Sequence, residues 1–215
     1  MQLTRAEFDE HYAAGKLKIA FIGMSNIGKS YTASRLSKSH DFQLVEVDQL
    51  IWEELGEQSM ADFARWQGQP YSSGYREREA KSIALETKAT RKALSQTDGN
   101  QLLDTTGSVI YVEDDVLRSL KNQWLIVHIK AEDRDMARLK SDYFNQPKPL
   151  VWRDKFIRDT SMSEQDNIRA CYDGLLQSRK AAYAALADIT LTSSFILDAD
   201  TSMDAIFDAM RAPLI

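Results

Sequence analysis

Short apolar runs alternate with longer amphipathic segments along this chain of 215 residues. Apolar runs of a few residues predict buried strands, and the segments between them are long enough for crossover helices. This alternation is typical of an α/β fold with a mostly parallel sheet. We therefore predict a five-stranded sheet with strands at these apolar runs: 17–22, 42–47, 101–104, 124–129 and 195–198.

Two regions interrupt the alternation. Residues 49–97 contain no convincing strand, and residues 143–163 hold two of the four prolines, Pro147 and Pro149. Ligands of open α/β sheets bind beyond the carboxyl ends of the strands, where irregular segments can close over them. We expect a helical substrate-binding insert at about 49–97 and a lid at about 143–163.

Length and composition restrict the class of protein. A helical lead-in at residues 1–15 and a single domain at 16–215 are expected from a chain of this size. The net charge of −5 argues against a nucleic-acid or membrane-surface partner. Cys171 is the only cysteine, the N-terminal residues are too charged for a signal peptide, and charged residues interrupt every long apolar stretch. These features favour a cytoplasmic protein, which we expect to be a monomer or a weak homodimer.

The segment Gly23–Ser30 carries a complete G-x-x-x-x-G-K-S motif between the first predicted strand and a helical pattern. Glycines let the backbone N–H groups turn inward, and the positive end of the following helix points to the same place, so a phosphate group fits there. Lys29 is expected to reach the β- and γ-phosphates of ATP, and Ser30 to contact Mg²⁺. The predicted nucleotide contacts are Gly23, Ser25, Asn26, Ile27, Gly28, Lys29, Ser30 and Tyr31.

Carboxylates stand at the ends of the next two predicted strands. Glu46 and Asp48 are two residues apart, a spacing that places them on one side of an extended chain. Glu46 is a candidate for holding a water bound to Mg²⁺. Asp48 is a candidate for a general base or for a hydrogen-bond partner of a substrate diol. It could equally well cap a helix that starts at Gln49. Asp104 competes with Glu46 for the metal role. The turn Thr105–Ser108 after it suits either a phosphate or substrate contact or a plain strand-ending turn.

The order and approximate spacing of five segments resemble those of the shikimate kinases, from about Leu17 to Ile189. This family has the P-loop fold of the nucleoside monophosphate kinases, so the resemblance implies a three-layer α/β structure with a helical insert and a lid. It also implies an ATP-dependent transfer of the γ-phosphoryl group to a hydroxyl. The similar segments are Gly23–Ser30, Val45–Ile51 (family D-x-D), Tyr75–Glu79 (F-R-x-x-E), Lys148–Leu150 (R-P-L) and Arg179–Tyr183 (R-x-x-x-Y).

The resemblance also implies roles for individual residues. Asp48, Arg76, Gly107 and Arg179 would bind the substrate, with the two arginines holding a carboxylate in the fork that guanidinium provides. Lys29, Asp48 and the lid cation Lys148 would carry the catalysis.

Arg138 lies on the helix predicted after the fourth strand, where the family often has an arginine against the adenine. It is therefore a candidate nucleotide contact, and a solvated position on the helix is the alternative.

Three departures from the family pattern affect working positions. Glu46 replaces the first aspartate, Thr106-Gly107-Ser108 replaces three glycines, and Lys148 replaces the lid arginine. Side chains at this turn would stand where a substrate ring approaches the backbone, and lysine supplies a point charge without a planar fork.

These departures fit a branch with a different substrate as well as they fit shikimate itself. We expect a small-molecule kinase that acts on an anionic hydroxyl acceptor, a carboxylated polyol such as shikimate or a related compound. The alternatives are a kinase for another acceptor, such as a sugar acid or a nucleoside, and a nucleotide-binding regulatory protein without catalysis.

Overall fold

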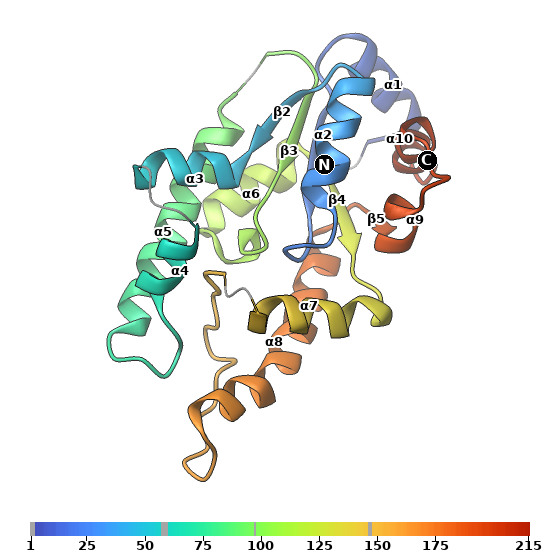
Figure 1. Ribbon diagram of the computed structural model, residues 1–215. Coiled ribbons are helices and arrows are strands. Elements are labelled where there is room, and N and C mark those ends of the chain that lie inside the picture. The colour runs from blue at the N-terminus through green and yellow to red at the C-terminus, as the bar shows by residue number, and fades with distance from the viewer. Residues whose placement is uncertain (1–2, 57–59, 97, 146–147) are drawn as a thin grey trace.

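One parallel sheet organises the molecule (Figure 1). The computed structural model describes the chain except residues 1–2, 57–59, 97 and 146–147. Within the described residues the sheet has five strands in the order β2-β3-β1-β4-β5, and every neighbouring pair is parallel. The strands are β1 (Lys18–Ile22), β2 (Gln43–Glu46), β3 (Gln101–Asp104), β4 (Leu125–Lys130) and β5 (Ile189–Thr192).

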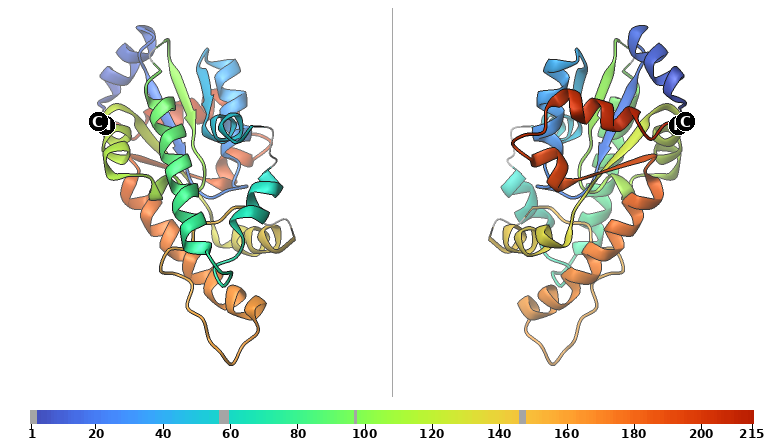
Figure 2. Two further views of the ribbon diagram at one scale, coloured as in Figure 1. Left: turned by 90° about the vertical axis from the view of Figure 1, so that its left-hand side faces the viewer. Right: turned by 90° about the vertical axis from the view of Figure 1, so that its right-hand side faces the viewer.

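Helices cover both faces of the sheet. On one face α2 and α10 pack against the strands, and on the other α6 and α8 do so, with α5 packed beside α6 (Figure 2). Covered faces explain why the central strands β1, β3 and β4 are almost entirely buried and read as apolar runs. The helices are α1 (Arg5–Ala13), α2 (Lys29–Ser39), α3 (Val47–Leu55), α4 (Met60–Gln67), α5 (Tyr75–Leu94), α6 (Asp114–Gln123), α7 (Asp133–Asn145), α8 (Glu164–Leu186), α9 (Ser193–Leu197) and α10 (Met203–Arg211), with a 3₁₀ turn at Val109–Tyr111.

The structure confirms the predicted α/β class with a five-stranded parallel sheet, but the predicted fifth strand was wrong. Residues 195–198 belong to α9 and its end, and the strand is Ile189–Thr192. Thr192 caps α9 by accepting a hydrogen bond from the backbone N–H of Phe195, so the chain turns into a helix directly after the strand. A short apolar run alone does not distinguish a buried strand from a buried helical turn.

The second strand also ends earlier than predicted. It stops at Glu46, and α3 begins at Val47, so Asp48 lies in the first turn of a helix and not on an extended segment. The first turn is a favourable place for a carboxylate, because the helix dipole is positive there. Glu46 and Asp48 therefore do not share one side of a strand.

Parallel register brings three chain segments to one edge of the sheet. Asp104 at the end of β3 is paired with Phe21 of β1 on one side and with Glu46 of β2 on the other. The loop after β1, the first turn of α3 and the turn after β3 therefore start next to one another. This edge is where an open α/β sheet binds its ligands.

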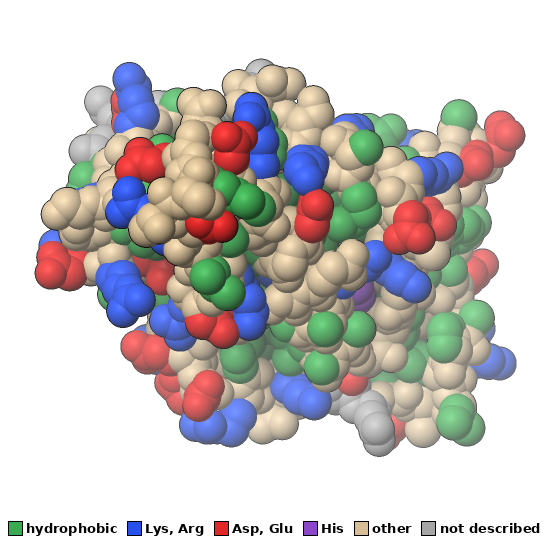
Figure 3. All heavy atoms as spheres, turned by 90° about the horizontal axis from the view of Figure 1, so that it is seen from below, with side chains coloured by type: hydrophobic (Ala, Val, Ile, Leu, Met, Phe, Trp, Pro, Cys, Tyr) green, Lys and Arg blue, Asp and Glu red, His purple; other side chains and the backbone are tan. Residues whose placement is uncertain are grey.

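The surface at the lower end of the molecule in Figure 1 carries acidic and basic side chains interspersed with apolar ones (Figure 3). A surface of mixed sign lacks the extended basic field that nucleic-acid backbones require. No helix in the described part of the chain is both long enough and apolar enough to cross a membrane.

Candidate active site

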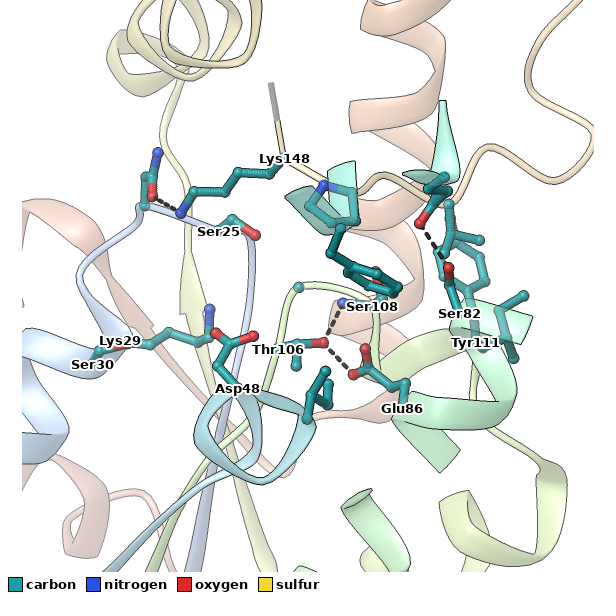
Figure 4. A pocket seen from close by; sticks show the side chains of 18 of the residues that line it. Ser25, Lys29, Ser30, Asp48, Ser82, Glu86, Thr106, Ser108, Tyr111 and Lys148 are labelled. Carbon is teal, nitrogen blue, oxygen red and sulfur yellow. Dashed lines mark hydrogen bonds between the residues drawn. The ribbon is translucent and has the colours of Figure 1, made fainter. Parts of the chain in front are cut away.

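A cavity of about 440 Å³ opens at the carboxyl edge of the sheet. Four segments enclose it: the loop after β1, the helices α3 to α5, the turn after β3 and the segment that follows α7 (Figure 4). Most of the predicted site residues line this cavity, namely Ser25, Asn26, Gly28, Lys29, Ser30, Tyr31, Asp48, Gly107 and Lys148.

The loop after β1 has the backbone shape that a phosphate cradle needs. Gly23 and Gly28 have φ of 145° and 107°, in the region that favours glycine. A Cβ at Gly23 would lie 2.6 Å from the carbonyl oxygen of Ile129, and one at Gly28 would lie 2.9 Å from Leu197 of α9. Both positions therefore favour glycine by conformation, and at Gly23 the backbone of Ile129 also leaves no space for a side chain.

Lys29 is the buried cation of this loop. Its side chain is 5% exposed, and Nζ donates to the carbonyl oxygen of Met24 at 3.0 Å. Burial lowers the pKa of Lys29, while the carboxylates of Asp104 and Asp48 oppose that shift. The ammonium group is thus held inside the loop, close to the two carboxylates.

Ser30 and Asp104 form the best candidate site for a divalent cation. The Ser30 side chain lies beside Asp104 and lowers the pKa of its carboxyl group, and no donor among the described residues reaches the buried Oδ1 of Asp104. Burial raises the pKa of Asp104, and the charge of Lys29 partly offsets this. A hydroxyl beside a carboxylate with a free oxygen is a donor set that suits Mg²⁺ together with phosphate oxygens and water. Glu46 is exposed beside Asp104, where it suits a water bound to the metal.

Asp48 and Glu86 face the part of the cavity beyond Lys29. Asp48 projects from the first turn of α3 toward Lys29 (Figure 4). Glu86 projects from α5, is 7% exposed, and accepts a hydrogen bond from the Thr106 hydroxyl. The backbone N–H of Ser108 donates to the same Thr106 oxygen at 2.9 Å, which directs the Thr106 proton to Glu86.

Sequence reasoning missed Glu86. The pKa of Glu86 is raised to about 7. Burial is the main cause; the hydrogen bond from Thr106 opposes the rise, and the charge of Asp48 adds to it. A signal was present in the sequence, because Glu79, Ser82 and Glu86 follow one another at helical spacing on the buried face of α5. Polar residues at these positions indicate a helix face that is turned toward a polar site.

The turn after β3 is wedged between the phosphate loop and α8. A Cβ on Gly107 would lie 2.7 Å from Oγ of Ser25 and 3.1 Å from its backbone nitrogen, so any side chain here would require Ser25 to shift. The Gly107 carbonyl oxygen accepts hydrogen bonds from Nη1 of Arg179 at 3.0 Å and from the Tyr183 hydroxyl. The turn therefore joins the two predicted substrate-binding positions, Gly107 and Arg179.

The two arginines predicted to hold a carboxylate do not meet in the cavity. Arg76 is exposed on α5 and does not line it. Arg179 is buried behind the turn after β3: its Nη2 donates to the carbonyl of Val151 at 3.0 Å, and its guanidinium lies 5.2 Å from the ring centre of Tyr111. Arg179 lines only a smaller adjoining cavity of about 60 Å³. The expected arginine pair is thus not assembled in this structure, because α5 turns Arg76 outward.

The segment after α7 is attached to the insert. Gln67 of α4 and Tyr75 of α5 both donate to the carbonyl of Leu150, at 2.7 and 2.6 Å. Glu79 accepts the backbone N–H groups of Trp152 and Arg153 at 2.6 and 3.0 Å. These bonds close one wall of the cavity. Of the predicted lid, residues 143–145 belong to α7 and residues 146–147 lie outside the described part.

Two cations contact the phosphate loop at Asn26. Lys148 donates to Oδ1 of Asn26 at 2.7 Å and lines both cavities. Arg138 donates to the Asn26 carbonyl at 3.0 Å and pairs with Asp142, but it lines neither cavity. In this structure Arg138 positions the loop, and its predicted contact with the nucleotide stays a prediction.

Comparison with known proteins supplies the family. The model of the shikimate kinase family matches residues 25–210. The chain belongs to the shikimate kinase family. A shikimate kinase-like protein is an ATP-dependent phosphotransferase with an alcohol group as acceptor. No curated protein sequence matches the chain.

Solved structures of shikimate kinases share the fold of this family member. The enzyme from Acinetobacter baumannii in complex with shikimate is 19% identical, with a TM-score of 0.61 over 94% of this chain and 93% of that one. The enzyme from Bacteroides thetaiotaomicron is 13% identical, with a TM-score of 0.60 over 93% and 99%. The enzyme from Aquifex aeolicus is 18% identical, with a TM-score of 0.54 over 92% and 94%. Identities this low show the fold and do not establish the acceptor.

We predict that Glu86→Gln changes how stability depends on pH. The pKa of Glu86 rises from 4.5 to about 7 on folding, so the native state binds the extra proton and its stability falls as the pH rises through this interval. The amide does not titrate. Denaturant unfolding should be measured at a series of pH values. Between pH 4.5 and pH 8 the free energy of unfolding of the variant should rise by about 3 kcal/mol relative to that of the parent. The exposed Glu77→Gln on the same helix is the control, and parallel curves for parent and Glu86→Gln would contradict the prediction.

We predict that Gly107→Ala weakens nucleotide binding. The new methyl group must displace Ser25, which belongs to the phosphate loop. Titration calorimetry should show the Kd for Mg·ATP rising about tenfold, in line with the cost of small misplacements in a site. Gly174→Ala is the matched control, because a Cβ there meets nothing within 4 Å. Equal Kd values for the two variants would show that the turn does not set the shape of the loop.

Proposed function

We propose that this protein transfers the γ-phosphoryl group of ATP to a hydroxyl of a small polyhydroxylated acceptor held between α3, α5 and the turn after β3. The proposal rests on one observation: Lys29, Ser30 and Asp48 line one cavity and Asp104 lies beside Lys29 and Ser30, although these groups come from three separate chain segments. Each of these groups suits a different part of phosphoryl transfer.

The phosphate loop would bind the ATP phosphates, with Lys29 on the transferred group. Ser30 and Asp104 would hold Mg²⁺, and Glu46 a water on it. Mg²⁺, when bound, offsets the negative charge of the phosphates. Lys148, placed beside Asn26, would add a second positive charge from the segment that closes the cavity.

Asp48 would orient the acceptor hydroxyl and take its proton. The hydroxyl oxygen then forms a bond to the γ-phosphorus, the bond from that phosphorus to the bridging oxygen breaks, and ADP leaves. Little covalent chemistry falls to the protein, so positioning and charge neutralisation supply most of the rate.

The acceptor is the finer part of the proposal. The structure from Acinetobacter baumannii holds shikimate, so shikimate and related carboxylated polyols are the first acceptors to test. Gly107 would contact the acceptor through its backbone. Arg179 would reach a carboxylate only if it released its two backbone carbonyl partners.

We predict that Lys29→Met abolishes turnover. The variant loses the buried positive charge that faces the transferred group, and the expected drop in kcat is at least about a thousandfold. ADP release and phosphorylated product should be measured together, in the presence of Mg·ATP and an acceptor. Undiminished phosphorylation would refute the assigned nucleotide site. Retained nucleotide binding by a parent protein that phosphorylates no acceptor would favour the regulatory alternative.

We predict that Asp48→Asn lowers kcat by about a hundredfold or more and leaves the KM for ATP nearly unchanged, because the amide cannot take a proton. Arg76→Ala serves as the comparison. Since Arg76 is exposed outside the cavity, its variant should change the acceptor KM by less than about twofold. Steady-state kinetics with both substrates varied will distinguish the two. A large rise in acceptor KM for Arg76→Ala would instead restore its predicted substrate contact.

A further inference from the structure

The acceptor end of the cavity is acidic. Its carboxyl groups are those of Asp48 and Glu86, from α3 and α5. The two lysines that line the cavity, Lys29 and Lys148, both hydrogen-bond to the phosphate loop, and Lys29 lies beside Asp48 where the phosphate loop meets this end (Figure 4). No arginine is among the described lining residues. A substrate bound at this end therefore lies against carboxyl groups.

The nearest guanidinium cannot serve a ligand as it stands. Arg179 is 4% exposed, and its two terminal nitrogens are occupied by the carbonyl oxygens of Gly107 and Val151. These bonds place the side chain behind the turn after β3. The charge of Arg179 still acts on Glu86, but the fork that grips a carboxylate is engaged with the backbone.

Glu86 and Thr106 form one unit at this end. The Thr106 hydroxyl donates to Glu86 and accepts from the backbone N–H of Ser108, so the orientation of the carboxyl group is determined. Thr106 occupies the turn that resembles the Gly-Gly-Gly turn of the shikimate kinases. The side chain that departs from the family pattern is thus the one that holds the buried carboxyl group.

Charge repulsion and hydrogen bonding point to the same acceptor. A carboxylate placed here would add a negative charge beside two carboxyl groups in a poorly solvated site. The one cation nearby among the described lining residues, Lys29, donates to the Met24 carbonyl and would face the phosphates of bound ATP. A hydroxyl group can donate to either carboxylate, and the apolar side chains of Ile51 and Phe63 can contact the carbon skeleton.

We propose that the acceptor is an uncharged polyol, and that Glu86 receives one of its hydroxyl groups and selects against carboxylated analogues. This inference rests on the proposed kinase function and names its substrate class. Glu86 is a specificity-determining residue in this scheme, whereas Asp48 acts on the hydroxyl that is phosphorylated.

Matched acceptor pairs test the inference. Shikimate is compared with its methyl ester, gluconate with glucitol, and glucuronate with glucose, so each pair keeps most of its hydroxyl groups and differs in charge. Phosphorylated product is measured by mass spectrometry alongside ADP release. For the parent protein, the best uncharged acceptor should exceed its acid counterpart in kcat/KM by at least about tenfold, the factor that 1.4 kcal/mol of discrimination gives.

Glu86→Gln should lower that preference about tenfold, mainly by improving the acid members. The amide keeps an acceptor for the Thr106 hydroxyl and removes the charge. Glu77→Gln, which removes a charge from the exposed side of the same helix, should leave the preference unchanged. The comparison within the parent protein needs no variant, so the inference stays testable if Glu86→Gln fails to fold.

Two results would overturn the inference and leave the kinase function intact. One is a preference of the parent protein for the acid members, and the other is an unchanged preference in folded Glu86→Gln. Product from none of the acceptors, charged or uncharged, would count against the inference and the proposed function together.

Discussion

The parallel register of β2, β3 and β1 is the constraint on which the site depends. Pairing of Asp104 with both Phe21 and Glu46 aligns three strand ends, so the phosphate loop, the start of α3 and the turn after β3 leave the sheet side by side. A slip of one residue in either pair would turn Asp104 to the opposite face. This register brings the charged groups of Lys29, Asp48 and Asp104 close to one another.

Close backbone approach turns this alignment into a site. Gly107 lies so close to Ser25 that a side chain there would displace it, and the Gly107 carbonyl oxygen accepts hydrogen bonds from Arg179 and Tyr183 of α8. Glu79 holds the segment after α7 by accepting backbone N–H groups of that segment. The cavity is therefore shaped by hydrogen bonds between different helices and loops. This arrangement places the carboxyl groups of Asp48 and Glu86 at the acceptor end.

Local patterns were sufficient for the fold class and for the nucleotide end of the site. Gly23–Ser30 has a recognisable spacing because a phosphate cradle needs consecutive residues of one loop, and the structure gives both glycines positive φ. Asp48 and Asp104 were found because they follow apolar strands. The fifth strand was misplaced, since the short run at 195–198 has the composition of a strand but is capped as a helix by Thr192.

The acceptor end depended on the tertiary structure. The orientation of α5 and α8 about their axes determines whether Arg76 and Arg179 reach a substrate. The carbonyl groups that these arginines contact also matter, and a sequence motif predicts neither. Glu86 acquires its environment from Thr106, twenty residues away in the sequence. The sequence by itself determined the phosphate loop and the alternation of strands and helices, because both arise from contacts between near neighbours in the chain. Only packing between α3, α5, α8 and the turn after β3 decided which charges face the acceptor, because burial and hydrogen-bond partners there come from distant residues.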